Sequence, residues 1–256
     1  MSFLPDPIGI LGVNVTPLTI DQLHNYIAGV VRNNRRELIL NVNVHCLNLA
    51  WENIWLRDFL NEANIVFCDG AGVIIGARIL GKHIPERITY ADWLYQFSEF
   101  SETQDFSLFF LGAKPGVADD AARHLVSIHP NLRIVGTQHG YFDKTASSQE
   151  NEEIIAKINE AKPNILILGF GMPLQERWLM DNWHTVDANV ALTGGAVFDY
   201  LSGRLSRAPG WMTDNSLEWL GRLVVEPKRL WRRYLVGNPL FMWRVLNERL
   251  LGEARQ

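Results

Sequence analysis

The chain has 256 residues, of which 47% are hydrophobic and 20% are charged. This balance predicts a globular protein, either one large α/β domain with an appendage or two small domains, and excludes a largely disordered chain. The amino terminus lacks a basic stretch followed by an apolar one, and no run of about 18 apolar residues is free of charge, so we expect neither a signal peptide nor a spanning helix. Cys46 and Cys68 lack metal-ligand spacing and fit free thiols in the reducing cytoplasm.

The net charge of −4 is distributed unevenly along the chain. Residues 204–256, the tail, carry ten Arg or Lys against five Asp or Glu, whereas residues 1–203 carry fourteen against twenty-three. A basic tail on an acidic body predicts that the tail meets an anionic partner, such as phosphates or a membrane surface. Because the acidic body would repel a phosphate chain, we do not expect nucleic acid to be that partner.

Strand and helix patterns alternate along the chain. Residues 8–15 predict a strand, and the capping-box spacing of residues 19–22 predicts a helix that continues to about Arg35. Further strands are predicted at residues 37–44, 65–68, 106–111, 132–137, 164–168 and 189–192. Further helices are predicted at residues 46–62, 72–80, 92–100, 117–128, 149–161 and 174–183. Such alternation predicts a mostly parallel, doubly wound sheet with helices on both faces.

The first candidate for a catalytic group is Asp69, within residues 66–73 (VFCDGAGV). A buried apolar run ends at this carboxylate, and Gly70 and Gly72 allow a tight turn before the next apolar run. In an open α/β sheet such a turn lies at the carboxyl ends of the strands, where ligands bind. The alternative is that Asp69 only caps the following helix, because Asp is a favoured N-cap residue. This stretch alone favours the capping interpretation.

Other predicted strands also end in polar or Gly-rich corners, at residues 41–43, 112–114, 136–140, 169–173 and 193–195. Glycines there allow backbone N–H groups to approach a phosphate, as in a nucleotide site. No dinucleotide fingerprint, P-loop or G-x-S-x-G elbow occurs, which disfavours an oxidoreductase, an NTPase and a hydrolase. The histidines form no H-E-x-x-H cluster, so we predict no metal site, although His45 and His139 remain candidates for touching a ligand.

The tail combines tryptophans with arginines. Pro227 and Pro239 are predicted to separate three helices, at about 216–225, 228–235 and 240–251. An apolar stripe would lie beside a basic side formed by Lys228, Arg229, Arg232 and Arg233. Two interpretations are equally supported, a helix in a membrane interface and an ordinary packing helix with a solvated face.

Eight segments occur in an order that matches a known family. They are residues 69–73 (DGAGV), 86–89 (ERIT), 110–117 (FLGAKPGV), 139–142 (HGYF), 171–176 (GMPLQE), 194–199 (GGAVFD), 207–209 (RAP) and 226–235 (EPKRLWRRYL). Together they resemble the WecG/TagA/CpsF family of glycosyltransferases, also called glycosyltransferase family 26, from about Ile10 to Glu248. The resemblance implies a modified Rossmann-like core of the GT-E type, a UDP-sugar donor, and a polyprenyl-diphosphate-linked acceptor at the cytoplasmic membrane face. It also implies inverting transfer without a metal or other cofactor.

The resemblance implies roles for individual residues. Asp69 matches the family's proposed general base, and the other strand ends together with this pattern make the catalytic interpretation the favoured one. The expected substrate-binding residues are Asn41, Asn43, Arg87, Gln175, Gly194, Gly195, Asp199 and Arg222, of which Arg222 would fold over the donor diphosphate. The expected membrane-binding residues are Lys228, Arg229, Trp231, Arg232 and Arg233. The chain departs from the family pattern at Asn41, where threonine is expected, and at Tyr90, where glycine is expected.

We therefore expect a Rossmann-like core at residues 1–206 and a basic, Trp-rich membrane-targeting appendage at residues 207–256, with the protein peripheral on the inner face of the plasma membrane. The expected reaction moves an N-acetylhexosamine, hexose or uronic acid from a UDP-sugar to a lipid-linked acceptor in cell-surface polysaccharide or teichoic acid synthesis. Because no D-x-D pair occurs, arginine is the better candidate for stabilising the leaving diphosphate. The alternatives left open are a non-catalytic nucleotide-sugar sensor or scaffold, a homo-oligomer, and Asp92 as a second carboxylate of the pocket.

Overall fold

The computed structural model describes residues 4–207, 212 and 218–253. Its main sheet has six strands, all parallel, in the order β4-β3-β8-β7-β5-β6. These strands are β3 (Glu37–Val42), β4 (Ile65–Cys68), β5 (Ser107–Gly112), β6 (Arg133–Gln138), β7 (Ile165–Gly169) and β8 (Val190–Thr193). The expected Rossmann-like, doubly wound α/β class is confirmed.

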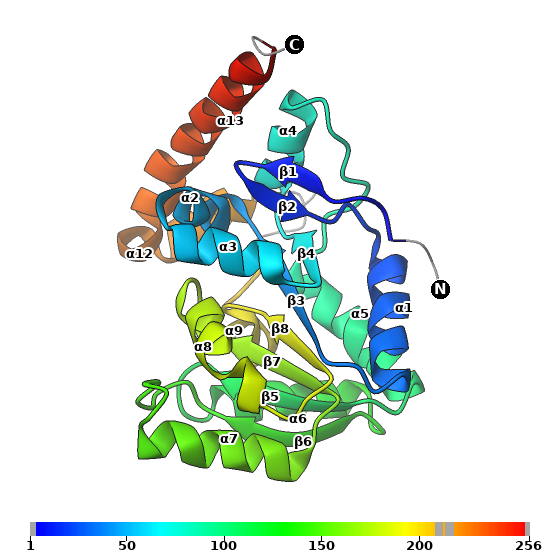
Figure 1. Cartoon of the computed structure of the whole chain (residues 1–256). Helices are drawn as coiled ribbons and strands as arrows, with labels where there is room; N and C mark the ends of the chain where they lie inside the picture. The colour runs from blue at the N-terminus through cyan, green and yellow to red at the C-terminus, as the bar shows by residue number, and fades with distance from the viewer. Residues whose placement is uncertain (1–3, 208–211, 213–217, 254–256) are drawn as a thin grey trace.

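The strands are buried because helices cover both faces of the sheet (Figure 1). Side chains alternate between two apolar layers, so that Leu40 and Val42 of β3 enter one layer and Ile39 enters the other. The first layer is covered by α2 (Val44–Glu52), α3 (Ile54–Glu62), α4 (Ala71–Ile79), α7 (Gln149–Ala161) and α8 (Leu174–Asn182). The second is covered by α1 (Ile20–Arg32), α5 (Tyr90–Thr103), α6 (Val117–Ile128) and α9 (Val197–Leu201).

Two local predictions within residues 1–206 were wrong. Residues 8–15 form an antiparallel hairpin, β1 (Ile8–Ile10) and β2 (Val13–Val15), because Leu11 and Gly12 both adopt positive φ, at 51° and 80°, and reverse the chain. The single helix predicted at residues 46–62 is divided into α2 and α3. Asn53 lies between them in an extended conformation, and its side-chain amide donates to the carbonyl of Leu49 at 2.8 Å.

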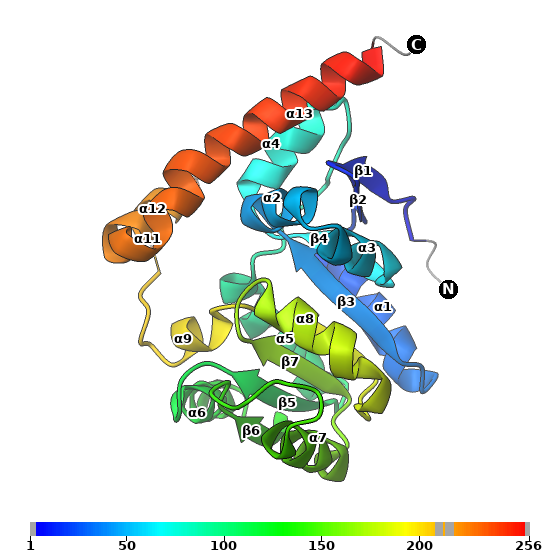
Figure 2. The same ribbon diagram turned by 60° about the vertical axis from the view of Figure 1, so that its left-hand side comes forward.

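The described part of the tail is helical from α11 (Glu218–Val225) through α12 (Pro227–Trp231) and a π-helical turn, η2 (Arg232–Val236), to α13 (Gly237–Glu253). The predicted break at Pro239 is absent from this described stretch. Pro239 is the third residue of α13, which directly follows the π-helical turn η2, and the wider hydrogen-bond spacing of this turn interrupts the regular α-helical pattern just before the proline. Figure 2 shows α13 lying along α4 and over α2, at the end of the molecule opposite α7.

α13 is fixed to the core by close packing and by polar contacts. Phe241 and Val245 are 1% and 0% exposed, and a Cβ added to Gly76 of α4 would meet the Phe241 ring at 2.6 Å. The guanidinium of Arg244 donates to Asn48 Oδ1 at 3.0 Å and to Glu52 Oε1 at 2.7 Å. The helix is therefore part of the folded body.

Phe241→Ala should lower the free energy of unfolding by about 3 to 5 kcal/mol, because it removes a buried ring that no neighbouring side chain replaces. Trp243→Ala is the matched control on the same helix, since Trp243 is 61% exposed and its removal should cost about 0.5 kcal/mol or less. Urea denaturation of the three proteins measures the difference. Equal effects of the two substitutions would contradict this packing of α13.

Candidate active site

Asp69 lies directly after β4, at the carboxyl edge of the sheet, and its N–H donates to the carbonyl of Val42 at 2.8 Å. Gly70 has a φ of 134°, which other residues rarely adopt, and a Cβ at Gly72 would lie 2.5 Å from Val44 Cγ2. Both glycines are thus needed to bring the turn against α2. The N-cap residue of α4 is Gly70, so Asp69 precedes the cap position by one residue. Asp69 lies partly exposed at the strand ends, and its catalytic role stays a prediction.

Two neighbouring strands place polar side chains behind this carboxylate. Asn41 of β3 donates from Nδ2 to Asp69 Oδ2 at 3.1 Å, and Thr193 of β8 donates from Oγ1 to Asn41 Oδ1 at 2.9 Å. Asn41 is 2% exposed and Thr193 is fully buried. Asn41 was expected to bind substrate, but both ends of its amide are already bonded to protein groups.

Asn43 and Arg87 flank the Asp69 turn. Asn43 is the N-cap of α2, where its Oδ1 accepts from the N–H of Cys46 at 3.1 Å, and its Cβ lies near Gly70. The segment that carries Arg87 is anchored by a hydrogen bond from the N–H of Ile88 to the carbonyl of Cys68, at 3.0 Å. The pKa of the Cys68 thiol is raised by burial and by the Asp69 carboxylate, while the charge of Arg87 opposes the shift. Both residues therefore adjoin the candidate base.

Gln175 holds two glycine-rich corners together. Its Oε1 accepts from the N–H of Gly171, after β7, at 3.2 Å and from the N–H of Gly195, after β8, at 3.1 Å. Gly194 is fixed by its own N–H, which donates to the carbonyl of Leu168 at 2.7 Å. Gln175 is fully buried, so the structure gives it a role in shaping the two corners.

Glu176 lies beneath these corners. It is fully buried and accepts from Gln175 Nε2 at 2.9 Å through Oε1, but its Oε2 has no hydrogen-bond partner among the described residues. Burial raises the pKa of this carboxyl to about 7. The buried phenol of Tyr90 lies nearby, and its pKa is raised by burial and then by the charges of Asp69 and Glu176. The floor of the site is thus dry and polar.

The tail covers the corner that follows β8. The guanidinium of Arg222 lies over the Tyr200 ring of α9, 5.6 Å from its centroid. The pKa of the neighbouring Asp199 is raised by burial, and this shift is opposed by the charge of Arg229 on α12. Arg229 also pairs with Glu226 at 2.9 Å. Of the two residues expected to bind substrate here, Arg222 of α11 thus lies against α9, and Asp199 of α9 lies within reach of the charge of Arg229 on α12.

The structure separates Arg233 from Arg232, although both were expected to face the membrane. Arg233 is partly buried, and its pKa is lowered by burial and by the charges of Arg222 and Arg229, while the charge of Asp69 raises it. Its charge also contributes to lowering the pKa of His45 at the start of α2 to about 4, an effect due mainly to burial. Arg232 is exposed, with its guanidinium 5.2 Å from the centroid of the Trp231 ring. The π-helical turn carries Arg233 towards Asp69.

Two other sequence candidates have protein partners of their own. His139 follows the edge strand β6, and its Nδ1 accepts from the N–H of Tyr141 at 3.3 Å. Asp92 forms an ion pair with Arg207, as expected for a structural contact. Within the described ranges, no three His, Cys, Asp or Glu side chains are grouped to hold a metal.

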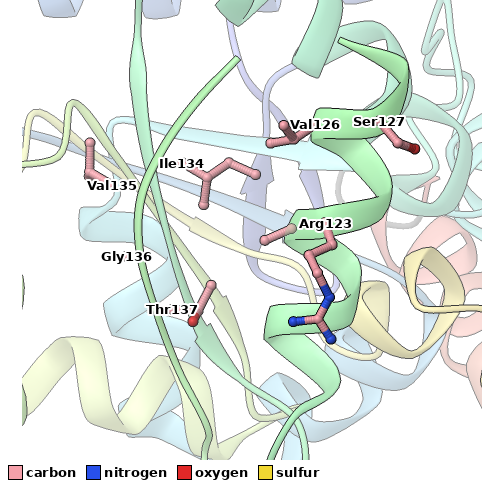
Figure 3. A pocket seen from close by; sticks show the side chains of 8 residues that line it. Arg123, Val126, Ser127, Ile134, Val135, Gly136 and Thr137 are labelled. Carbon is pink, nitrogen blue, oxygen red and sulfur yellow. The ribbon is translucent and has the colours of Figure 1, made fainter. Parts of the chain in front are cut away.

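A shallow hollow lies elsewhere on the protein, between α6 and β6 (Figure 3). It is lined by mostly apolar side chains, among them Val126 and Ile134. None of the candidate site residues lines it, because β6 and β4 are opposite edges of the sheet. The hollow is therefore distinct from the strand-end cluster around Asp69.

Comparison with known proteins gives one family and two informative relatives. The model of the Glycosyl transferase WecG/TagA/CpsF family matches residues 8–255. An N-acetylglucosaminyldiphosphoundecaprenol N-acetyl-beta-D-mannosaminyltransferase of Bacillus subtilis (strain 168) is 30% identical over 191 residues, which cover 75% of this chain and 72% of the relative. A protein of the same name from Staphylococcus aureus (strain NCTC 8325 / PS 47) is 26% identical over 242 residues, which cover 93% of this chain and 91% of the relative.

Glu176→Gln should make the protein relatively more stable as pH rises. The folded-state pKa of about 7 exceeds the ordinary value of 4.5, so the folded protein binds the extra proton, and this contribution to stability is lost as pH rises through 7. The free energy of unfolding of the variant minus that of the native protein should therefore rise by roughly 3 kcal/mol from pH 4.5 to pH 8. Urea denaturation at both pH values measures the difference, in which the unchanged histidines cancel. A pH-independent difference would show that Glu176 is not neutral in the fold.

Proposed function

The chain belongs to the WecG/TagA/CpsF family of glycosyltransferases, and from that premise we propose that it transfers a sugar from a UDP-sugar to a polyprenyl-diphosphate-linked acceptor with inversion at the anomeric carbon. The names of the two relatives support an N-acetylmannosaminyl donor and an N-acetylglucosaminyl diphosphoundecaprenol acceptor. The observation that carries the proposal is the position of Asp69, a carboxylate at the strand ends whose surroundings include the charge of Arg233. A base and a cation are the two groups that such a transfer requires.

In the proposed reaction, Asp69 accepts the proton of the acceptor hydroxyl while that oxygen attacks the anomeric carbon. The bond from this carbon to the diphosphate oxygen breaks, and its electron pair leaves with UDP. Attack from the face opposite the leaving group inverts the configuration. The partly exposed carboxylate at the carboxyl edge of the sheet is placed where a ligand of an open α/β fold binds.

The negative charge that develops on the leaving diphosphate requires nearby donors. We assign this role to Arg222 and Arg233, whose charges are close enough to each other to lower the pKa of Arg233. Mutual repulsion between two guanidinium groups is relieved when a diphosphate binds between them, and Arg side chains bind phosphate oxygens in bidentate geometry. The glycine corners fixed by Gln175 supply backbone N–H groups on the same edge of the sheet.

The tail also presents a surface suited to a membrane interface, which is where a polyprenyl-linked acceptor resides. No helix in the described part of the chain is long and apolar enough to cross a membrane. Trp243, Leu246 and Leu250 are exposed at helical spacing on α13, and the basic side chains of Lys228 and Arg232 are exposed nearby in sequence. Apolar side chains inserted among headgroups, together with basic ones facing anionic lipids, support peripheral binding.

Asp69→Asn should fold normally and lose transfer by roughly 10²- to 10⁴-fold, because the amide cannot accept the proton. The assay combines a panel of UDP-sugars, including UDP-N-acetylmannosamine, with a polyprenyl-diphosphate N-acetylglucosamine acceptor. Asp58→Asn on α3 is the control, since this carboxylate is 60% exposed and lies outside the site. Undiminished transfer by the Asp69 variant would remove it from the mechanism, whereas donor binding without product in the native protein would favour a sensor or scaffold.

Neighbouring arginines give a sharper test of how the tail acts. Arg233→Met should lower kcat/KM for the donor by roughly 10- to 10²-fold, as expected for the loss of one group that stabilises developing charge, and should leave liposome binding unchanged. Arg232→Met should weaken binding to anionic liposomes about fivefold, the effect of one basic residue near an anionic surface, while transfer to a water-soluble acceptor stays the same. If both variants lost the same property, the division of roles along η2 would be refuted.

A further inference from the structure

Three neighbouring strands place one continuous chain of side-chain hydrogen bonds at the carboxyl edge of the sheet. Thr193 ends β8, Asn41 lies in β3, the strand between β8 and β4, and Asp69 follows β4. The distances are 2.9 Å from Thr193 Oγ1 to Asn41 Oδ1 and 3.1 Å from Asn41 Nδ2 to Asp69 Oδ2. The chain therefore runs across the sheet and ends on the candidate base.

The chemistry of the three groups fixes the direction of both bonds. An ionised carboxylate only accepts hydrogen bonds, so Asn41 must turn its NH₂ group towards Asp69. Its Oδ1 then faces Thr193, whose hydroxyl has to be the donor. With Asn41 2% exposed and Thr193 fully buried, water does not compete for these positions. Rotation of the amide by half a turn would place Oδ1 against the carboxylate, where two acceptors repel each other, so the carboxylate sets the orientation of the amide and the Thr193 hydroxyl adapts to it.

We propose that Thr193 and Asn41 are positioning residues for the catalytic base, with Thr193 holding the Asn41 side chain in place and Asn41 orienting the Asp69 carboxylate. This inference rests on the proposed function, in which Asp69 accepts the proton of the acceptor hydroxyl. A bond to Oδ2 fixes the rotation of the carboxylate relative to the sheet, and donation from an amide stabilises its ionised form. Both positioning side chains are buried, so they act through the partly exposed Asp69.

Other ionisable groups also act on Asp69. All of them remain in the variants that test the hydrogen-bonded chain Thr193–Asn41–Asp69, called the relay below. Tyr90 of α5 and the Cys68 thiol of β4 both have a pKa raised by burial and by the charge of Asp69. Two cations also lie near these groups. The charge of Arg87 lowers the pKa of the same thiol, and the charge of Asp69 favours the charged form of Arg233 on η2. A comparison of variants that differ only at Thr193 or Asn41 therefore isolates the hydrogen-bonded chain.

Thr193→Val removes the hydroxyl at nearly constant volume, and Asn41→Leu removes the amide donor. We expect kcat to fall about tenfold in the first variant and roughly 10²-fold in the second, as for a misplaced catalytic group. The KM for the donor should change less than about twofold, because binding groups are untouched. The acidic limb of the pH profile of kcat/KM should move up by about half to one pH unit, since the ionised base loses a donor. Thr193→Ser, which restores a hydroxyl, should return both kcat and the limb to the native values.

Ser98→Ala is the matched control, because Ser98 is also fully buried but its hydroxyl donates only to the carbonyl of Leu94 on α5, at 2.7 Å. It should leave kcat and the pH profile unchanged. If Asp69→Asn abolishes transfer while Thr193→Val keeps native kcat and acidic limb, the relay is refuted and the base survives. If Asp69→Asn transfers normally, the base assignment fails and the relay fails with it. Thermal melting verifies folding, and should Asn41→Leu not fold, the Thr193→Val and Thr193→Ser pair decides alone.

Discussion

The parallel alignment of β4, β3 and β8 is the constraint on which the candidate site depends. Parallel strands end at the same edge of the sheet, so the Asp69 carboxylate after β4, the Asn41 amide in β3 and the Thr193 hydroxyl at the end of β8 meet there. Asn41 and Thr193, which share a hydrogen bond, are 152 positions apart in the chain. Because both sheet faces are covered by helices, the groups behind Asp69 are dry and must satisfy one another. Only Asp69, one step beyond its strand, remains partly exposed. The fold thus leaves one end of the chain of hydrogen bonds accessible to a ligand.

The second determinant is the attachment of the tail. Close packing of Phe241 against Gly76 and the polar contacts of Arg244 fix α13 to α4 and α2. The π-helical turn at the start of this helix then holds Arg233 near Asp69, while exposed apolar residues such as Trp243 lie on the outer surface. One helical run therefore supplies a cation to the site and a surface for an interface. Binding of that surface to lipid would bring the site to its acceptor without movement of a separate domain.

The sequence predicted what short-range patterns determine. Apolar runs followed by polar corners placed Asp69 at a strand end, and they predicted the sheet class correctly. It did not reveal that Asn41 is bonded at both ends, because its partner Thr193 becomes a neighbour only through the crossover that pairs β3 with β8. Arg233 was grouped with Arg232 because both are basic and adjacent in the chain, although neighbours in a helix point in different directions, and the π-helical turn itself has no simple sequence pattern. The spacing of three residues between Arg233 and the buried Leu230 was a signal that could have placed Arg233 on the inner side.

The buried polar groups beneath the site support its location independently of any relative. In the described part of the chain, Glu176 Oε2 is buried without a hydrogen-bond partner, and the buried Tyr90 hydroxyl lies within electrostatic reach of this carboxyl. Each such group costs roughly 1 to 3 kcal/mol, so a fold optimised only for stability would replace them with apolar side chains. Polar groups retained against that cost concentrate where a site requires them. Burial raises the pKa of the Glu176 carboxyl to about 7, so near neutral pH this group is divided between its neutral and ionised forms. A proton on Glu176 reduces the negative charge that the buried Tyr90 phenol meets, so the two groups share the buried space at lower cost than two charges would.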